Sequence, residues 1–414
     1  MRKIRKLLVT LSVLVAIGGN ASASNAKTTV AEGALPLKSY EEQAVSMALA
    51  EPVVTQESLG IRAKSAYLMD FGTNTMIYAE NELQRLPIAS MCKIMTALLA
   101  FDAIESDVLD MQEEICVSER AASMGGSQVF LEANAKYPVR ELIKSIIVCS
   151  ANDSCVAMAE RISGSEGVFV EKMNEKAKEI GANNTLFSNC TGLPKEPQYS
   201  CAKDVAVMLK ALLEHQEYYE FSKVWMDKFQ HPEGRYTEIT NTNKLVRFYD
   251  GCDGGKTGFT NEAGFCLAAT AKRNNMRIIS VVIGEENSAN RFDDVRTMFD
   301  YAFANYSVSP IVEANVALEK TANVSGGKEK QVIVQPIRSS YAFGRRGEKQ
   351  DVTTEISFKK LRAPIEIGEN VGEVTVFNNG IEVDRIPLVA AVRVERAGFA
   401  DLFKEVARGW NSRK

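Results

Sequence analysis

The chain has 414 residues, 45% of them hydrophobic, which is enough for two or three domains with packed cores. Lysine and arginine number 49 against 53 aspartates and glutamates, and this net charge of −4 gives no reason to expect nucleic-acid binding. The two histidines, His215 and His231, are too few to favour a histidine-rich metal site or a histidine-based triad. We expect no metal ligands and no cofactor.

Residues 1–23 have the features of an export signal. A basic start precedes an apolar run over 7–17 and a small-residue cleavage site that ends at Ala23. The alternative is an uncleaved membrane anchor, but the run is well short of the roughly 20 residues that cross a bilayer. We therefore expect the mature chain to begin near Ser24 and to work outside the cytoplasm. Residues 24–60 are of mixed composition and predict a leader segment.

The segment 61–306 contains strand patterns at both ends and helix patterns between them. Two β-rich runs, 66–70 and 75–78, surround a short turn with glycine and predict a β-hairpin. Apolar residues at helical spacing predict a buried helix over 90–101. Further helices are predicted over 138–149, 153–163, 167–180, 203–214 and 291–305, and further strands over 256–260, 265–271 and 277–283. This order predicts an α/β (α+β) domain with one antiparallel sheet covered by helices.

The composition changes after the segment 307–310, which predicts a break between two domains. Residues 311–395 consist of short β-type segments separated by glycine-rich turns, the pattern of a small all-β domain. The tail, 396–414, places large apolar residues on one face of a predicted helix and carries five basic and two acidic residues. Such a helix suits an anionic membrane surface; the alternative is a helix docked on the all-β domain. The apolar face consists of Phe399, Leu402, Phe403, Val406 and Trp410.

Eight cysteines occur in this exported chain, without any CxxC pair of the metal-binding kind. Several lie inside apolar stretches, where cysteine commonly serves as a small buried residue. We expect most of them to be buried thiols, although disulfides remain an alternative that the spacing does not decide.

Ser90 and Lys93 form the first pair that suggests chemistry. They are three positions apart at the start of a predicted helix, so both side chains leave the same helix face. A serine hydroxyl needs a base to become a nucleophile, and a desolvated lysine is neutral often enough to serve. The helix N-terminus would also favour negative charge near the serine. Taken alone, the pattern is weak, and a capping serine beside a surface lysine explains it better.

Two further polar motifs change that balance. The triplet Ser-Ala-Asn at 150–152 follows an apolar run, where polar residues need a reason. The triplet Lys-Thr-Gly at 256–258 follows a pair of glycines and begins a predicted strand that continues with Phe259. In the order Ser-x-x-Lys, Ser-x-Asn and Lys-Thr-Gly, the three motifs of this exported chain resemble those of penicillin-binding proteins and serine β-lactamases.

The sequence around these motifs is similar to the low-molecular-mass D-alanyl-D-alanine carboxypeptidases. The similarity spans about 60–305. In 311–414 only the general pattern matches the family's second domain and tail: short β-type segments followed by an amphipathic helix. The resemblance implies a penicillin-binding/β-lactamase-like fold, peptidoglycan stem peptides ending in D-Ala-D-Ala as substrates and β-lactams as inhibitors. It is carried by 86–96, by 150–153, by 184–187 with Asn189, Gly192, Leu193 and Pro194, and by 253–260.

Carried over residue by residue, the family's catalytic roles fall on three residues. The resemblance implies that Ser90 is the nucleophile and that Lys93 is its general base. It implies that Ser150 relays the proton to the leaving amine. The intermediate would be an acyl-enzyme on the serine, and hydrolysis of its ester would later release the shortened peptide.

The remaining roles concern the substrate. The resemblance implies that Asn152 hydrogen-bonds the substrate's amide and that Lys256 attracts its carboxylate while keeping the general base partly neutral. Thr257 would donate a hydrogen bond to the same carboxylate. Gly258 continues the motif, and the N–H of Phe259 would form the oxyanion hole with the N–H of the nucleophile.

Three positions depart from the family's pattern. Cys92 stands where threonine is usual, and we expect a tolerated small residue rather than a second nucleophile. Thr242 replaces an arginine that some members use near the carboxylate, and Phe259 replaces a histidine found in some members. Two other functions remain as alternatives: a β-lactamase, and a non-catalytic protein that binds the cell wall or senses penicillin.

Overall fold

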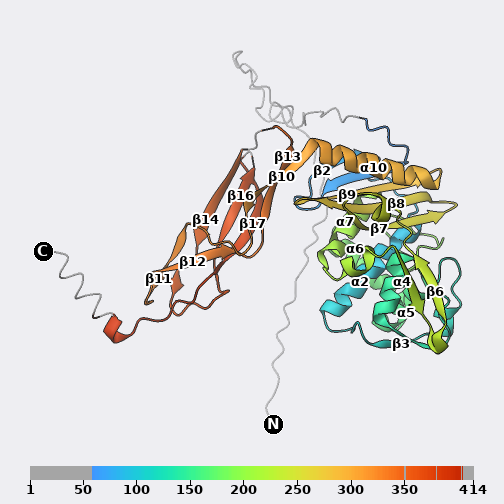
Figure 1. The fold of residues 1–414 in the computed structure, drawn as a ribbon, viewed down its shortest axis with the longest axis horizontal. Helices are drawn as coiled ribbons and strands as arrows, with labels where there is room; N and C mark the ends of the chain where they lie inside the picture. The colour runs from blue at the N-terminus through green and yellow to red at the C-terminus, as the bar shows by residue number, and fades with distance from the viewer. Residues whose placement is uncertain (1–57, 349–350, 379, 402, 404–414) are drawn as a thin grey trace, which may run out of the picture. The chain divides into compact units, whose positions relative to one another are not determined.

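The computed structural model describes residues 58–348, 351–378, 380–401 and 403. The predicted signal at 1–23, the leader up to residue 57 and all but the first turn of the predicted tail helix lie outside these residues. The described chain forms a mixed domain of helices and strands followed by a domain built of strands (Figure 1).

One five-stranded sheet supports the first domain, in the order β2-β1-β9-β8-β7, with every neighbouring pair antiparallel. The strands at both ends of the domain meet in this sheet, which confirms the predicted arrangement. Their bounds are β1 (Ser65–Asp70), β2 (Met76–Glu80), β7 (Cys252–Thr260), β8 (Gly264–Arg273) and β9 (Met276–Glu285).

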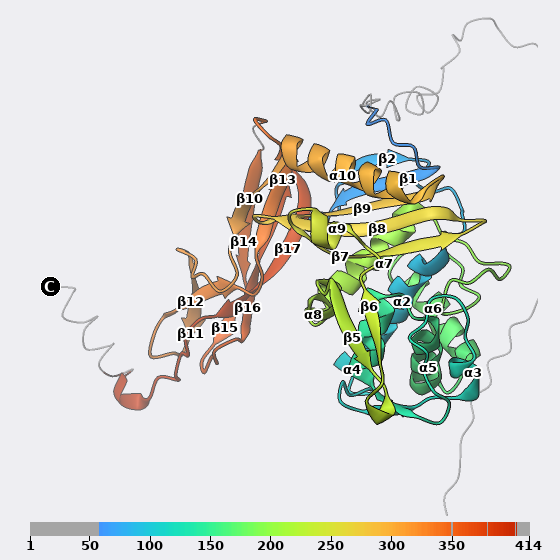
Figure 2. The ribbon, with the colours of Figure 1, turned by 45° about the vertical axis from the view of Figure 1, so that its right-hand side comes forward.

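Helices cover both faces of the sheet. The long α10 (Ser288–Asn305) crosses one face, and the helices α2 to α8 lie together on the opposite side, below the sheet in Figure 2. Among these, α2 (Lys93–Glu105) is apolar on nearly all sides and runs through the core. The others are α3 (Glu119–Ala122), α4 (Val139–Val148), α5 (Asn152–Ser163), α6 (Glu166–Glu179), α7 (Ala202–Glu214) and α8 (Tyr218–Ser222).

Several short elements surround the helical layer, and the sequence did not indicate them. They include the pair β3 (Glu114–Cys116) and β4 (Lys136–Pro138), the hairpin β5 (Met226–Gln230) and β6 (Tyr236–Thr240), the helix α9 (Leu245–Phe248) and the 3-10 turn η2 (Pro232–Gly234). The predicted helix 90–101 begins as the 3-10 turn η1 (Ala89–Cys92), which leads into α2. The hairpin escaped prediction because it is mostly exposed: Phe229 and Ile239 are its buried side chains, so no alternating pattern stands out.

The second domain has its own core beneath a six-stranded sheet in the order β14-β16-β17-β12-β11-β15. A separate pair joins β10 (Tyr306–Val312) to β13 (Ser340–Arg345). The segment 307–310, after which the composition changes, is not a connecting loop: it is a strand, in which Val308 pairs with Phe343. The remaining strands are β11 (Thr321–Ser325), β12 (Gln331–Pro336), β14 (Val352–Phe358), β15 (Leu361–Arg362), β16 (Asn370–Asn378) and β17 (Ile381–Ala390).

The described start of the tail belongs first to the all-β domain. Arg396 forms a β-bridge with Gly327, and the N–H of Ala397 bonds to the carbonyl of Gly326. Helical structure begins only at Phe399, whose side chain is 86% exposed. None of the helices in the described ranges has the length and apolar character needed to cross a membrane.

All eight cysteines are free thiols. Six are buried, Cys149 is partly buried and Cys116 is exposed. The prediction of small buried residues rather than a disulfide framework is confirmed for most of them.

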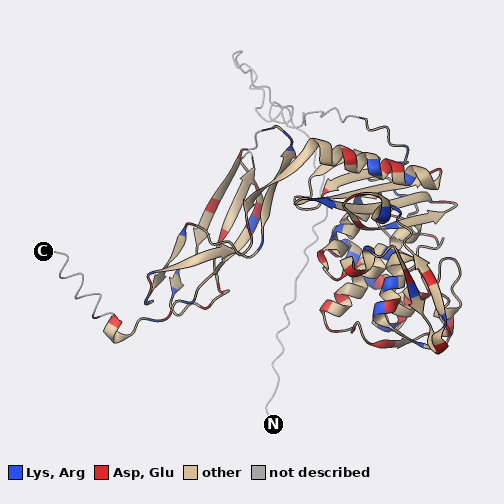
Figure 3. Ribbon diagram, in the orientation of Figure 1, with Lys and Arg blue, Asp and Glu red and all other residues tan. Residues whose placement is uncertain are grey.

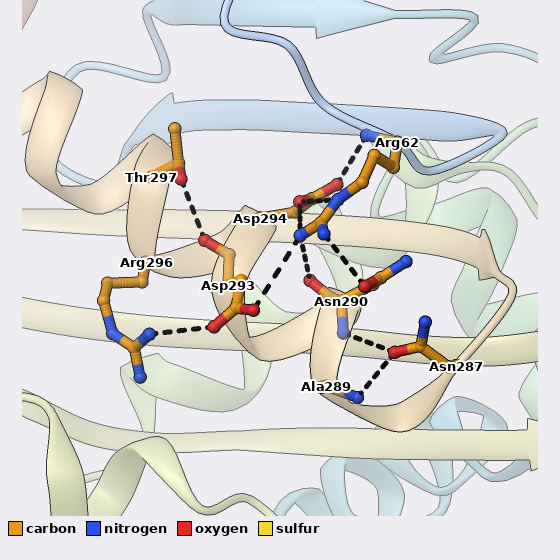
Figure 4. A network of polar contacts seen from close by, with 8 residues as sticks. All are labelled: Arg62, Asn287, Ala289, Asn290, Asp293, Asp294, Arg296 and Thr297. Carbon is orange, nitrogen blue, oxygen red and sulfur yellow. Dashed lines mark hydrogen bonds and ion pairs between the residues drawn. The ribbon is translucent and has the colours of Figure 1, made fainter.

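Acidic and basic residues alternate along α10 (Figure 3), and some of them tie the helix to the start of the domain. The carboxylate of Asp294 accepts hydrogen bonds from the backbone N–H of Arg62 at 2.6 Å and from its Nε at 2.9 Å (Figure 4). Arg62 also donates to Asn290 at 2.9 Å. Next to this network lies Glu285, which is 1% exposed; burial and the nearby Asp294 raise its pKa to about 8.

We expect Glu285 to make the protein less stable as the pH rises. Its pKa lies above the ordinary value in the folded state, so the favourable contribution is complete below about pH 4.5 and is lost by about pH 8. Glu285→Gln cannot ionise and should remove this loss, a difference on the order of 2 kcal/mol between pH 5 and pH 9. Urea unfolding of both proteins at the two pH values measures it. If the free energy of unfolding changes equally with pH in both proteins, Glu285 is not protonated in the folded state.

Candidate active site

The nucleophile candidate lies on a short turn at the start of the central helix. Ser90 belongs to η1, which leads directly into α2, and its Oγ is 2.9 Å from Nζ of Lys93. The preceding Ala89 has a φ of +47°, a conformation that non-glycine residues avoid and that recurs at functional sites. The structure thus brings together the first predicted pair, with the lysine fully buried rather than on the surface.

A loop from a distant part of the sequence completes the surroundings of Lys93. Its Nζ also donates to the carbonyl of Thr191 at 2.5 Å. Asn189 shapes this loop, since its Oδ1 accepts from the N–H groups of Thr191 at 3.1 Å and Gly192 at 2.7 Å. A Cβ on Gly192 would lie 2.0 Å from the carbonyl oxygen of Ala89, so only glycine fits there. The resemblance in the sequence included Asn189 and Gly192, without this role, and did not include Thr191.

The second motif lies at the start of α5. Ser150 has a φ of +66°, and its Oγ is buried without a hydrogen-bond partner. Asn152 donates from Nδ2 to the carbonyl of Gly125 at 2.7 Å, while its Oδ1 is likewise buried without a partner. Buried polar atoms rarely stay unpaired, so these two are available to a bound molecule.

The third motif occupies β7 at the edge of the sheet. A Cβ on Gly258 would lie 2.6 Å from the carbonyl oxygen of Ile88 and 3.3 Å from the nitrogen of Ser90. Glycine therefore lets the strand lie directly against the nucleophile's turn. The hydroxyl of Thr257 donates to that of Thr242 at 2.8 Å, at the position where some members carry arginine.

The two aromatic residues that follow this motif stack on each other. Phe259 is 51% exposed and its ring centroid is 4.2 Å from that of Phe265. Arg291 of α10 lies over Phe265 and donates to the carbonyls of Gly258 at 3.1 Å and Cys266 at 3.4 Å. This arginine of α10 thus binds the backbone of both β7 and β8. No sequence motif had indicated it.

The two lysines of the site are both buried and line one small cavity. Burial lowers the pKa of Lys93. Burial, and then repulsion by Lys93, lowers the pKa of Lys256 to about 7. Because the groups interact, they titrate as a pair, and near neutral pH one of the two readily becomes neutral. A neutral amine beside a serine hydroxyl is the arrangement that general-base catalysis requires.

Neighbouring thiols do not compete with the serine. Cys92 is fully buried and donates from Sγ to the carbonyl of Asn189 at 3.3 Å. Burial raises the pKa of Cys92, and it raises the pKa of Cys155 to about 12. Both groups are therefore thiols rather than nucleophilic thiolates at neutral pH.

A single group of side chains in the described ranges has the donor atoms for a metal ion: Asp102, Glu105 and His215. It lies at the far end of α2 from the catalytic motif. The ammonium of Lys176 already binds Asp102 at 3.0 Å, and the imidazole Nε2 lies 3.1 Å from the same carboxylate. The group is an ion-paired junction of helices.

Comparison with known proteins agrees with this arrangement. Residues 52–287 match the family model described as D-alanyl-D-alanine carboxypeptidase, and 306–396 match the C-terminal domain of penicillin-binding protein 5. D-alanyl-D-alanine carboxypeptidase DacF of Bacillus subtilis is 40% identical over 86% of this chain and 92% of its own length. D-alanyl-D-alanine carboxypeptidase DacC of Escherichia coli is 30% identical over 83% of this chain and 87% of its own length.

Solved structures give the same result. Penicillin-binding protein 5 of Haemophilus influenzae aligns with a TM-score of 0.64 and 29% identity, covering 81% of this chain and 98% of its own. A peptidoglycan synthesis regulatory factor of Streptococcus pneumoniae aligns with a TM-score of 0.69 and 28% identity, over 81% and 100%. By its sequence, its fold and both of its domains, the chain belongs to the D-alanyl-D-alanine carboxypeptidase family of serine peptidases.

Proposed function

We propose that this enzyme removes the terminal D-alanine from peptidoglycan stem peptides through an acyl-enzyme on Ser90. The observation that carries the proposal is the contact of 2.9 Å between Ser90 Oγ and Lys93 Nζ, with the lysine 1% exposed. An exposed lysine would hold its proton at neutral pH, whereas a buried one beside a second lysine loses it readily.

Acylation begins when neutral Lys93 takes the hydroxyl proton of Ser90. The serine oxygen attacks the carbonyl carbon of the penultimate D-alanine, and the negative charge forms on the carbonyl oxygen. Backbone N–H groups of Ser90 and Phe259 stabilise that charge, as donors in oxyanion holes do. Ser150 passes the proton to the amine of the departing D-alanine, and a water molecule later hydrolyses the ester.

The substrate's own carboxylate helps to set the protonation of the lysines. It binds beside Lys256 and the hydroxyl of Thr257, and its negative charge keeps the shared proton on Lys256. Lys93 is then the neutral member of the pair. The pKa of about 7 for Lys256 implies that acylation slows as the pH falls below neutrality, because both amines become protonated.

The alternatives differ in what happens to D-alanine and to penicillin. We expect release of D-alanine from a peptide ending in D-Ala-D-Ala, and with penicillin a burst of one equivalent followed by a stall. Continuous penicillin hydrolysis without D-alanine release would favour a β-lactamase. Penicillin binding without any turnover of the peptide would favour a sensor.

We further propose that residues 1–23 are cleaved as an export signal and that the tail, 396–414, holds the enzyme on the outer surface of the membrane. The basic, amphipathic pattern of the tail supports attachment to anionic lipid. In the described part of the tail, Phe399 is 86% and Phe403 is 67% exposed, so neither packs into a core. We assign 61–306 to catalysis and 311–395 to the separate all-β domain.

Truncation after Ala397 should release the enzyme from the membrane without loss of activity. This position keeps the pairing of Arg396 and Ala397 with the all-β domain and removes the aromatic residues. Interfacial burial of each large apolar residue contributes on the order of 1 to 3 kcal/mol, and each nearby basic residue about 1 kcal/mol. Sedimentation of both signal-cleaved proteins with anionic vesicles, at low and high salt, measures the difference. Equal partition would favour a tail docked on the protein.

A further inference from the structure

The start of β7, just before Lys256, departs from regular strand geometry. The register against β8 shifts between Cys252 and Gly254, which marks a bulge. Gly255 follows with a φ of +129°, and a Cβ there would lie 2.2 Å from the carbonyl oxygen of Ala268. The bulge turns backbone N–H and C=O groups away from the ladder, so other partners must satisfy them.

Side chains from outside the sheet provide these partners. The N–H of Gly255 donates to Oη of Tyr218 at 2.9 Å. One turn further along α8, the hydroxyl of Ser222 donates to the carbonyl of Asp253 at 2.6 Å. Nδ2 of Asn243 donates to the carbonyl of Gly254 at 3.1 Å. The helix α8 thus holds the bulge with two side chains on one face.

Tyr218 also borders the catalytic lysines. Its side chain is 1% exposed and lines the same small cavity as Lys93 and Lys256. Burial raises its pKa, so the phenol stays neutral and accepts the N–H of Gly255 as a hydroxyl. A Cβ on Gly254 would lie 3.0 Å from both Cε1 and Oη of the tyrosine, which leaves the ring little freedom to move.

The other charged groups near the tyrosine are compensated. Asp253 and Arg277 form a pair with contacts of 2.7 and 2.8 Å, and the guanidinium lies over the ring of Tyr219. The thiol of Cys252 is buried, and its raised pKa keeps it neutral. Among the residues that line the cavity, Lys93 and Lys256 are therefore the two whose charge can change near neutral pH.

We propose that Tyr218 is a positioning residue for acylation, which fixes the bulge in β7 and thereby holds the Lys256 ammonium against Lys93. The inference rests on the proposed roles of the two lysines. Two buried ammonium groups repel each other, and the repulsion favours a neutral general base only while the distance between them is kept short. A loose strand start would let Lys256 withdraw and let Lys93 retain its proton.

Tyr218→Phe tests the proposal, because it removes the acceptor and keeps the ring. Tyr219→Phe is the matched control: it lies on the same helix, and its hydroxyl donates to the carbonyl of Leu213 at 3.1 Å, away from β7. For each protein we would measure the second-order rate constant of acylation by penicillin between pH 5 and pH 9, together with the melting temperature.

In Tyr218→Phe we expect acylation at pH 7 to fall about tenfold, since a buried N–H loses its acceptor. The acid limb of the pH profile should move upward by about half a unit or more, as the lysines return toward ordinary pKa values. The control should match the wild type in both respects. A purely structural role would lower the melting temperature and leave the acid limb in place, which would overturn the proposal.

If Tyr218→Phe does not fold, Ser222→Ala loosens the same bulge at the carbonyl of Asp253. An acid limb displaced in the same direction supports the proposal, and an unchanged limb overturns it. Wild-type release of D-alanine is measured first. Its absence would refute the proposed function, whereas an active wild type with unaltered variants would refute the inference alone.

Discussion

Replacing Ser90 by alanine should abolish both D-alanine release and covalent labelling by a fluorescent penicillin. The loss should exceed about a thousandfold, as for other nucleophiles that act in a concerted unit. The neighbouring Cys92 cannot take over, because it is buried and its raised pKa keeps it a thiol. Gel fluorescence after penicillin treatment and a D-alanine assay measure the two activities.

Cys92→Ala provides the control for that experiment. It changes a buried side chain two positions along the same turn, so it should report any general disturbance of η1. We expect this variant to be labelled within a few-fold of the wild-type rate. Labelling that persists in Ser90→Ala, with an unchanged melting temperature, would show that the acylated residue lies elsewhere.

Lys93→Arg should stop acylation although the positive charge is kept. Arginine has a pKa above about 12 and cannot give up a proton in a protein, so the serine loses its base. The loss should again reach about a thousandfold and should not recover at high pH. Stopped-flow acylation between pH 6 and pH 10 measures the effect, and circular dichroism checks the fold.

The contrasting variant is Lys256→Arg. If Lys256 acts as a cation, arginine should preserve part of the rate, whereas Lys93→Arg preserves none. The reverse result, with substantial acylation in Lys93→Arg and collapse in Lys256→Arg, would assign the base to Lys256. Comparison of the two variants therefore shows which of the two buried lysines is the general base and which acts as a cation.

The sequence predicted those parts of the fold in which local pattern and burial agree. The helix 90–101 was visible because α2 repeats apolar residues at helical spacing, and the β-hairpin 66–78 because its runs flank a glycine turn. The strand β10 was missed because Ser307 and Pro310 read as a break, while pairing with β13 makes them a strand. Tertiary pairing overrides local preference in such segments.

Predicting the active site depended on short sequence motifs and their spacing. The motifs around Ser90 and Lys256 are short and continuous, so their spacing could be recognised. The contact of Lys93 with the carbonyl of Thr191 could not be recognised, because the acceptor is a backbone atom. The contact of the Tyr218 hydroxyl with β7 could not be recognised either, because the tyrosine lies far along the chain from the strand that it supports. Residues that act through backbone contacts leave no residue-type pattern in a single sequence.

Mass spectrometry of the trapped acyl-enzyme tests the central claim most directly. The enzyme is mixed with a peptide ending in D-Ala-D-Ala, or with penicillin, and quenched in acid before the first turnover is complete. We predict one acyl group per molecule, on the proteolytic fragment that contains Ser90, together with one equivalent of released D-alanine for the peptide. Released D-alanine without any acylated protein, or an acyl group on another fragment, would contradict the mechanism.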